Sequence, residues 1–251
     1  MKLSVIVPVR NERDTIVTLL ERLRAVDCGM PKEIIVVDGA STDGTRDALA
    51  GLGPDPDLVL VLEDEARGKG RAVRTGFARA TGDIVMVQDA DLELDPAQIP
   101  ALLRPLIDDG APAVFGSRFK GRGRGGAPLT NYVGNVALTW AADVLFFTRL
   151  TDILTCYKVL TAEVARTLDL RCNGFDFDAE ITCRLLRDGY RIVEMPVTYA
   201  PRTADEGKKL TTGVGWSVLR AILRVRFSRP SARAASSPAA PMASPETVSE
   251  S

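Results

Sequence analysis

The chain has 251 residues, of which 45% are hydrophobic and 26% are charged. A chain of this size buries a full core and forms one large domain or two small ones. Its 32 basic and 33 acidic residues leave a formal net charge of −1, so the positive field of a nucleic-acid-binding protein is missing, and we expect no nucleic-acid partner. There is no histidine, which excludes this residue as a general base or a metal ligand.

Hydropathy and cysteine usage limit the possible cellular locations of the protein. The longest mostly apolar run, 136–147, has 12 residues and contains Asp143, whereas a membrane-spanning helix needs about 20 apolar residues. The four cysteines form no CxxC pair, and the N-terminus lacks the apolar core and the cleavage site of a secretory signal. We therefore expect no transmembrane span and a cytoplasmic protein.

In the first half of the chain, short apolar runs alternate with helical patterns, which is typical of βαβ units around a largely parallel sheet. The predicted strands are 3–9, 33–38, 58–62, 83–88 and 113–116. A helix packed on the sheet is predicted from apolar residues at steps of three and four, namely Ile16, Leu19, Leu20, Leu23 and Val26. Further helices are expected to begin at Thr42, Gly70 and Pro96. The predicted fold class is α/β.

The second half begins after 121–128, a glycine-rich basic segment that we expect to form a loop. Helices are predicted over 131–147 and 178–187, and a final strand over 190–199. The segment 216–227 combines apolar residues with three arginines, which favours either a basic amphipathic helix on an anionic membrane or a terminal helix packed on the domain. The last stretch, 228–251, is rich in alanine, serine and proline and is predicted to be disordered.

The strongest chemical signal is the segment QDADLE, which follows the apolar run 84–87. Asp89 and Asp91 would lie at the carboxyl end of that strand, where open α/β sheets bind ligands. Their oxygens suit Mg²⁺ or Mn²⁺ that also contacts substrate phosphates, and Glu93 would add a third carboxylate. The alternative is an acidic turn that caps the helix near Pro96.

Two further motifs suit a nucleotide. Asp38 ends the second strand in VVDGASTDGT, where an acidic residue can bind a ribose or a base edge. Lys69 lies between two glycines in RGKGRA, where backbone amides and a cation could meet a phosphate. Neither GxGxxG after the first strand nor a Walker A motif is present, so an NAD site or a P-loop is not expected.

VIVPVRNE, VVDGASTDGT, RGKGRA and QDADLE, in this order, resemble the nucleotide-sugar half of the family 2 glycosyltransferases, which have the GT-A fold. GSRF, LTDILTCYK, FDFDAEI and PRTADEGKKL resemble the branch with dolichol-phosphate mannose synthases and related polyprenyl-phosphate sugar synthases. The resemblance covers about residues 2–210. It implies a single domain, 1–227, with a nucleotide-sugar half, 1–116, and an acceptor half, 117–227.

The resemblance also implies roles for individual residues. The nucleotide pocket would be lined by Pro8, Arg10, Glu12, Asp38 and Lys69 together with Asp89. The metal would be held by Asp89, Asp91 and Glu93. The phosphate groups of donor or acceptor would be bound by Arg118, Arg202, Lys208 and Lys209, because an anionic acceptor needs fixed cations near an anionic donor.

The expected reaction is an inverting, metal-dependent transfer of a hexose from a nucleotide-diphosphate sugar, with GDP-mannose as the first candidate and a UDP-hexose as the second. A polyprenyl phosphate acceptor is already ionised near neutral pH and needs no catalytic base. A hydroxyl acceptor needs one, and Asp178 or Glu180 is the candidate. These two acids could instead only stabilise a helix N-terminus.

Other interpretations remain open at this stage. The chain could glycosylate a small molecule or a cell-wall precursor, or it could be an inactive nucleotide-sugar-binding partner subunit. A nucleotidyltransferase is disfavoured because PVRNE is not a glycine- and arginine-rich activation loop. A lipid acceptor would bring the protein into peripheral contact with the inner face of the membrane.

Overall fold

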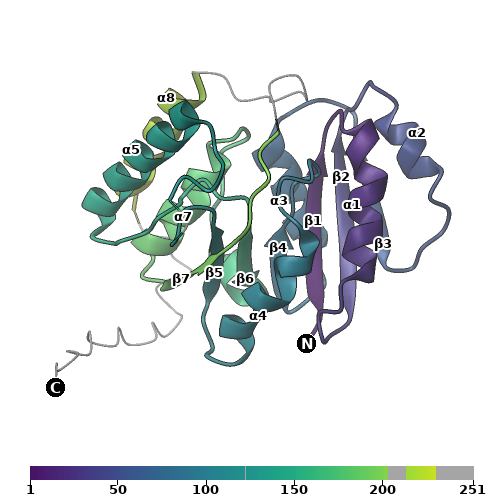
Figure 1. The fold of residues 1–251 in the computed structure, drawn as a ribbon, viewed down its shortest axis with the longest axis horizontal. Coiled ribbons are helices and arrows are strands. Elements are labelled where there is room, and N and C mark those ends of the chain that lie inside the picture. The colour runs from purple at the N-terminus through teal and green to yellow at the C-terminus, as the bar shows by residue number, and fades with distance from the viewer. Residues whose placement is uncertain (122, 203–212, 230–251) are drawn as a thin grey trace.

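The fold is that of a computed structural model that describes residues 1–121, 123–202 and 213–229. One seven-stranded sheet runs through the molecule in the order β3-β2-β1-β4-β6-β5-β7 (Figure 1). The strands are β1 Leu3–Val9, β2 Lys32–Gly39, β3 Leu58–Glu63, β4 Ile84–Val87, β5 Ala113–Ser117, β6 Lys158–Thr161 and β7 Ile192–Pro196. All of them run in one direction except β6, which pairs antiparallel with β4 and β5.

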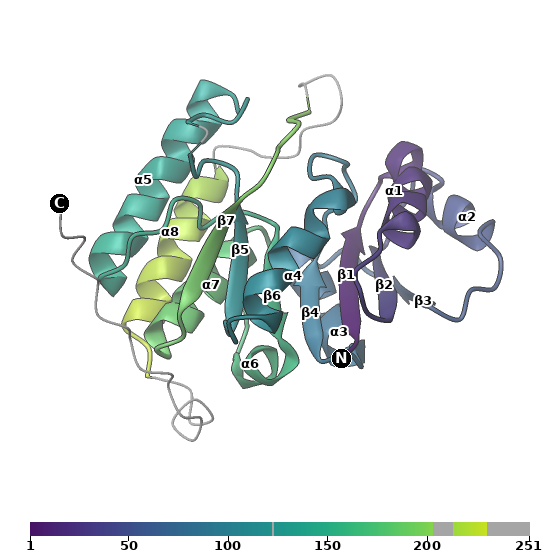
Figure 2. The same cartoon turned by 60° about the horizontal axis from the view of Figure 1, so that its bottom comes forward.

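Helices cover both faces of this sheet (Figures 1 and 2). They are α1 Arg13–Ala25, α2 Thr45–Ala50, α3 Lys69–Arg79, α4 Ile99–Ile107, α5 Leu129–Phe146, α6 Ala162–Thr167, α7 Phe177–Arg187 and α8 Gly213–Arg226, with a short 3₁₀ turn η1 Pro96–Gln98 before α4. Strands β1, β2 and β4 are buried almost throughout, as expected for strands with helices on both sides. The fold class predicted from the sequence is therefore confirmed.

A second apolar cluster lies beyond β7. There α7 and α8 pack on each other and α5 packs on both, at the end of the molecule away from α2 and β3 (Figures 1 and 2). Its buried residues include Ala142 of α5, Cys183 of α7, and Val218 and Ile222 of α8. Among the described residues, no helix is both long and apolar enough to cross a bilayer.

The predicted elements differ from the observed ones mainly in the second half. Strand β6 and helix α6 were not predicted, because a four-residue strand that begins with the charged Lys158 carries no periodic signal. The final strand is shorter than the predicted 190–199, and Tyr199 instead forms an isolated antiparallel bridge with Leu94. Residues 230–251 of the predicted disordered tail lie outside the described residues, and the division into two halves stays a prediction.

Candidate functional site

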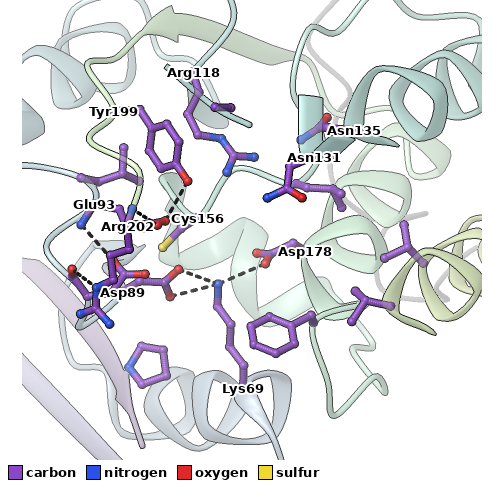
Figure 3. Close-up of a pocket in the computed structure, with 18 of the residues that line it drawn as sticks. Lys69, Asp89, Glu93, Arg118, Asn131, Asn135, Cys156, Asp178, Tyr199 and Arg202 are labelled. Atoms are coloured by element: carbon purple, nitrogen blue, oxygen red, sulfur yellow. Dashed lines mark hydrogen bonds and ion pairs between the residues drawn. The ribbon is translucent and has the colours of Figure 1, made fainter. Parts of the chain in front are cut away.

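A cavity of about 1050 Å³ lies at the edge of the sheet where the parallel strands end (Figure 3). Because these strands run in the same direction, the segments that follow them meet at one edge. The loops after β1, β4, β5 and β7 contribute Arg10, Asp89, Arg118 and Tyr199. The helices contribute Lys69 of α3, Asn135 of α5, Asp178 of α7 and Val218 of α8. Most of the predicted site residues thus gather around one cavity.

The acidic loop after β4 is tightly folded. The backbone N–H of Glu93 donates to Asp91 Oδ1 at 3.1 Å, and Leu92 has a φ of 61°, which a branched side chain rarely adopts. Burial, together with the charges of Asp89 and Glu93, raises the pKa of Asp91 to about 7. The loop therefore concentrates negative charge that the neighbouring cations do not fully compensate.

Glu93 does not fit its predicted role as a metal ligand. Its Oε2 accepts from the Tyr199 hydroxyl at 2.9 Å and its Oε1 from the Arg202 N–H at 2.9 Å, so the carboxylate fastens the segment after β7 to the acidic loop. Among the described residues, no three ligand-type side chains are grouped closely enough to hold a metal ion. The pair Asp89 and Asp91 still fits Mg²⁺ or Mn²⁺, which commonly bind one or two carboxylates and take their other ligands from phosphate and water.

Lys69 connects two sides of the cavity (Figure 3). Its Nζ lies 3.0 Å from Asp89 and 3.1 Å from Asp178. Burial by itself would lower the pKa of Lys69, but the carboxylates of Asp178 and Asp89 raise it well above its ordinary value. The ammonium group is therefore charged and fixed in place beside the acidic loop.

The glycines around Lys69 serve packing more than phosphate binding. A Cβ at Gly70 would lie 2.5 Å from the Cys172 carbonyl oxygen, and one at Gly68 would collide with the Asn173 carbonyl. The N–H of Arg71 already donates to that Asn173 oxygen at 3.3 Å. RGKGRA thus brings the start of α3 against the segment before α7, which places Lys69 next to Asp178.

The two candidate bases on α7 have different surroundings. Asp178 lines the cavity and accepts from Lys69 and, at 3.4 Å, from the buried Lys158. Glu180 is fully buried and is absent from the cavity wall. It accepts from the N–H groups of Arg171 and Cys172 at 2.8 and 2.7 Å and from the Arg184 guanidinium at 2.9 Å. The Glu180 carboxylate is therefore enclosed by structural donors, and of the two candidate bases Asp178 is the one that faces the cavity.

Arg118 lines the cavity, and a buried ion pair fixes its side chain. Its Nε and Nη2 donate to the two oxygens of buried Asp152 at 2.7 and 2.8 Å, and Asn135 donates to the same carboxylate at 2.8 Å. A bidentate pair of this kind fixes the guanidinium plane. Figure 3 shows the guanidinium pointing into the cavity, near Asn131. Arg118 thus lines the cavity with a buried counter-ion, and its role in binding phosphate stays a prediction.

Arg202 joins the segment after β7 to the loop between β1 and α1. Its Nη2 donates to Glu12 Oε2 at 2.7 Å and its Nε to the Asp91 carbonyl at 2.8 Å. Both Glu12 and Arg202 line the cavity, so Arg202 is available to a phosphate only beside an existing carboxylate. Lys208 and Lys209 lie outside the described residues.

The predicted nucleotide pocket forms the wall next to β1 and β2. Pro8, Arg10 and Glu12 line the cavity there, together with Gly39. Asp38 is buried just behind this wall, where its Oδ1 accepts from Arg46 at 2.5 Å. Its Oδ2 is buried without a hydrogen-bond partner among the described residues, a costly arrangement that a ligand donor would relieve.

Sequence reasoning did not single out three side chains of the site. Asp152 holds Arg118, Lys158 holds Asp178, and Tyr199 lies 5.3 Å from the Arg118 guanidinium with its hydroxyl on Glu93. Asp152 and Lys158 are the only charged residues in the sequence segment 150–160, and this contrast was the signal available. Cys156 also lines the cavity, but burial and then Asp89 raise the pKa of its thiol, so it stays protonated.

The chain was compared with known protein families, and the model for glycosyl transferase family 2 matches residues 4–141. The chain belongs to this family. Undecaprenyl-phosphate mannosyltransferase of Micrococcus luteus is 32% identical to this glycosyltransferase over 87% of the chain and 92% of the relative. Dolichol-phosphate mannosyltransferase of Pyrococcus furiosus is 31% identical over 83% of the chain and 59% of the relative.

One further sequence relative is longer than this chain, and one solved structure shares its fold. The chain spans 53% of the low-salt glycan biosynthesis hexosyltransferase Agl6 of Haloferax volcanii, with 30% identity over 88% of its own residues. Glucosyl-3-phosphoglycerate synthase from Mycobacterium tuberculosis, crystallised with Mn²⁺, uridine diphosphate and phosphoglyceric acid, superimposes with a TM-score of 0.69. That match covers 90% of this chain and 78% of the synthase at 22% identity, which shows a shared fold.

Proposed function

We propose that this glycosyltransferase moves a hexose, with inversion, from a nucleotide-diphosphate sugar to a polyprenyl phosphate. GDP-mannose is the first candidate donor and a UDP-hexose is the second. One observation carries the proposal: a single cavity combines an acidic loop and fixed cations at the sheet edge with an apolar wall that includes Leu138 of α5 and Val218 of α8. The phosphate end of a lipid phosphate would contact the charged part of the cavity, and its hydrocarbon end would contact the apolar wall.

The donor would occupy the wall beside β1 and β2. Pro8, Arg10 and Glu12 would contact the nucleoside, and the unpartnered Oδ2 of Asp38 would accept a hydrogen bond from the base or ribose. Lys69 would then lie beside the diphosphate. The uridine diphosphate in the synthase from Mycobacterium tuberculosis, which has the same fold, supports a nucleotide donor of this kind.

Asp89 and Asp91 would hold Mg²⁺ or Mn²⁺. When bound, the ion would neutralise the charge that develops on the leaving nucleoside diphosphate. Burial, and then the charges of Asp89 and Glu93, raise the pKa of Asp91 to about 7, and a cation at this position would relieve that cost. Lys69, already held by Asp89, would contribute a second positive charge on the same side.

Three cations would make the approach of an anionic acceptor possible. Lys69, Arg118 and Arg202 surround the cavity, and each is held by a carboxylate of the chain. Charges that are oriented before the substrate arrives need no reorganisation during the reaction. A phosphate monoester has a second pKa of about 6 and attacks in its ionised form, so no base is required. The absence of histidine agrees with this mechanism.

Transfer to a hydroxyl group is the second candidate, and the position of Asp178 in the cavity wall favours it. A general base contributes typically 10²- to 10⁴-fold, so Asp178→Asn should lower transfer to a hydroxyl acceptor by about that factor. Transfer to a polyprenyl phosphate should fall by less than about tenfold, because asparagine still offers an oxygen to Lys69. Equal losses with both acceptors would contradict the base assignment.

The decisive experiment is calorimetry of GDP-mannose, UDP-glucose and UDP-N-acetylglucosamine binding, with Mn²⁺ and with EDTA. One donor should bind in a metal-dependent way, and Asp91→Asn should abolish the metal dependence. Glu93→Gln is the matched control, since Glu93 has no place in the proposed metal site, and it should retain metal-dependent binding. Donor binding without any turnover on lipid phosphate or hydroxyl acceptors would instead favour the partner-subunit interpretation.

The proposal also bears on location. The hydrocarbon chain of a polyprenyl phosphate stays in the bilayer, so the enzyme would work at a membrane surface. Its four cysteines are all free thiols, which agrees with the reducing cytoplasm expected from the sequence.

A further inference from the structure

Helix α5 presents a continuous apolar stripe to solvent. Large exposed side chains recur at steps of three and four along it, namely Leu129, Val133, Val136, Trp140, Val144 and, just past its end, Phe147. The opposite side of the helix is buried at Asn135, Thr139 and Ala142. Trp140 is 68% exposed and Phe147 is 89% exposed, although apolar side chains of this size usually pack inside a soluble domain.

Helix α8 is apolar on two sides. Val218, Ile222 and Val225 pack into the cluster with α5 and α7. On the outer side, Trp216 is 75% exposed and Phe227 is 80% exposed, with Leu223 between them. The alternatives drawn from the sequence, a packed terminal helix and a membrane-surface helix, are therefore compatible on different faces of α8. The tertiary fold covers one apolar face and leaves the other in water.

Positive charge accompanies the exposed side of α8. Arg220, Arg224 and Arg226 are exposed, and the helix contains no acidic residue, in a chain whose net charge is −1. No carboxylate within the described residues forms an ion pair with Arg220 or Arg224. Arg226 reaches across to α5, with its guanidinium 6.0 Å from the Phe146 ring centre. The basic residues thus flank an apolar surface, which is typical of helices that lie in an anionic membrane interface.

The same two helices form the apolar part of the cavity wall. Leu138 and Gly134 of α5 and Val214 and Val218 of α8 line the cavity, while the stripes described above lie on other sides of these helices. The helices lie side by side at one end of the molecule (Figure 2). A lipid whose phosphate enters the cavity would therefore extend its hydrocarbon chain past α5 and α8.

We propose that the exposed stripes of α5 and α8, with the arginines of α8, dock on an anionic lipid bilayer and bring the cavity to the membrane surface. The inference rests on the proposed lipid-phosphate acceptor for its purpose, but the surface can be tested separately. Tryptophan and phenylalanine insert at the headgroup level, and each basic residue near an anionic surface strengthens binding.

Intrinsic tryptophan fluorescence can report on membrane binding, because Trp140 and Trp216 are the only tryptophans of the chain. Full-length protein is mixed with phosphatidylcholine vesicles that contain or lack 30% phosphatidylglycerol. We expect a blue shift of tryptophan emission with the anionic vesicles, quenching by brominated lipid, and release at high salt. Equal binding to neutral and anionic vesicles, or no shift with either, would overturn the proposal.

Variants assign the binding to this surface. Arg220→Gln with Arg224→Gln should weaken binding to anionic vesicles by about 25-fold, because each arginine contributes a factor of about five. The matched control, Arg22→Gln with Arg79→Gln, removes two exposed arginines from α1 and α3 and should bind as the wild type. Trp140→Ser should weaken binding by about tenfold, whereas Leu62→Ser, which removes an exposed apolar residue from β3, should not.

Two further readouts separate the possible outcomes. If the stripes instead bind a second copy of the chain, the blue shift will appear without vesicles as the protein concentration rises, and light scattering will give a dimer. This result would overturn the proposal.

Transfer to a short-chain polyprenyl phosphate in free solution tests the function alone. Surface variants should keep that activity and lose transfer to long-chain acceptor in vesicles. Vesicle binding by an inactive protein would refute the function and leave the surface intact.

Discussion

Two acidic residues of α7, just over half a helical turn apart, have different roles: one lines the site and the other is structural. Successive residues of an α-helix point about 100° apart, so Asp178 and Glu180 face directions about 200° apart. Asp178 therefore meets Lys69 at the cavity, while Glu180 meets Arg184 and the backbone of Arg171 and Cys172 in the interior. The carboxylates have the same chemistry and different partners.

This difference predicts that Glu180→Ala unfolds the protein more easily without acting through catalysis. Removing one partner of a buried ion pair leaves Arg184 and two N–H groups unsatisfied, so the free energy of unfolding should fall by about 3 to 5 kcal/mol. Urea denaturation followed by circular dichroism measures it. Glu65→Ala, which breaks an exposed pair with Arg67, is the control and should cost less than about 1 kcal/mol. Similar costs for the two variants would refute the structural role.

A second buried carboxylate makes stability depend on pH. Glu33 of β2 accepts from Lys2 at 2.7 Å, from Ser4 at 2.5 Å and from the Thr81 N–H at 2.7 Å. Burial opposes its charge, but these hydrogen bonds prevail and lower the pKa of Glu33 from 4.5 to about 2. Between these two values the unfolded chain binds a proton that the folded chain does not.

Glu33→Gln should therefore lower the free energy of unfolding by about 2 to 3 kcal/mol at pH 7. The contribution of the wild-type carboxylate is complete above about pH 4.5 and is lost as the pH falls to about 2, so the gap between variant and wild type should close over this interval. Urea titrations from pH 7 to pH 2.5 measure it. A gap that stays constant would contradict the assignment, and the exposed Glu65→Gln should show no gap at any pH.

At the scale of elements, the close contact between α3 and β1 sets the position of Lys69. A Cβ at Gly76 would collide with the side chain of Ile6, so only glycine lets α3 lie this close to the sheet. Gly134 of α5 has nothing within 4 Å of such a Cβ. A larger side chain is therefore excluded by packing at Gly76 but not at Gly134.

Gly76→Ala should destabilise the protein by about 1 to 3 kcal/mol, because overpacking outweighs the gain in helix propensity. Gly134→Ala should stabilise it by about 0.5 to 1 kcal/mol, since it restricts the unfolded chain and meets no obstacle. Thermal unfolding of the two variants checks both signs. A stabilised Gly76→Ala would mean that α3 packs less tightly against β1 than the structure indicates.

At the scale of the whole molecule, the site is assembled from segments that are far apart in the sequence. Arg202 pairs with Glu12, and Lys69 with Asp178. A donor in the cavity would contact segments from both halves of the chain and would bind only the folded chain. Its binding free energy therefore adds to the stability of the entire domain.

We expect a nucleotide-diphosphate sugar with Mn²⁺, at about 100 times its dissociation constant, to add about 2.7 kcal/mol and raise the midpoint of thermal unfolding by about 5 to 10 °C. EDTA should remove most of the rise. Differential scanning calorimetry with and without metal measures both effects. An equal rise in EDTA would contradict a metal between Asp89, Asp91 and the diphosphate.

The sequence by itself determined the fold class and the location of the acidic loop. Short runs rich in β-branched residues, such as Leu3–Val9, predict strands buried on both faces, and turn residues separate them from amphipathic helices. Because parallel strands end at one edge, Asp38 and Asp89 were assigned to one region without coordinates, and the family resemblance added Arg118. These features depend on local patterns, which a single sequence contains.

Only the tertiary structure decided which charges meet and which faces stay exposed. Arg118 meets Asp152, Glu93 meets Tyr199, and Glu180 lies in the interior. The stripe around Trp140 looks like any core-facing helix in the sequence, yet its side chains lie in water. The physical reason is that periodicity shows that a helix has an apolar face, whereas burial of that face depends on which distant elements are left to cover it.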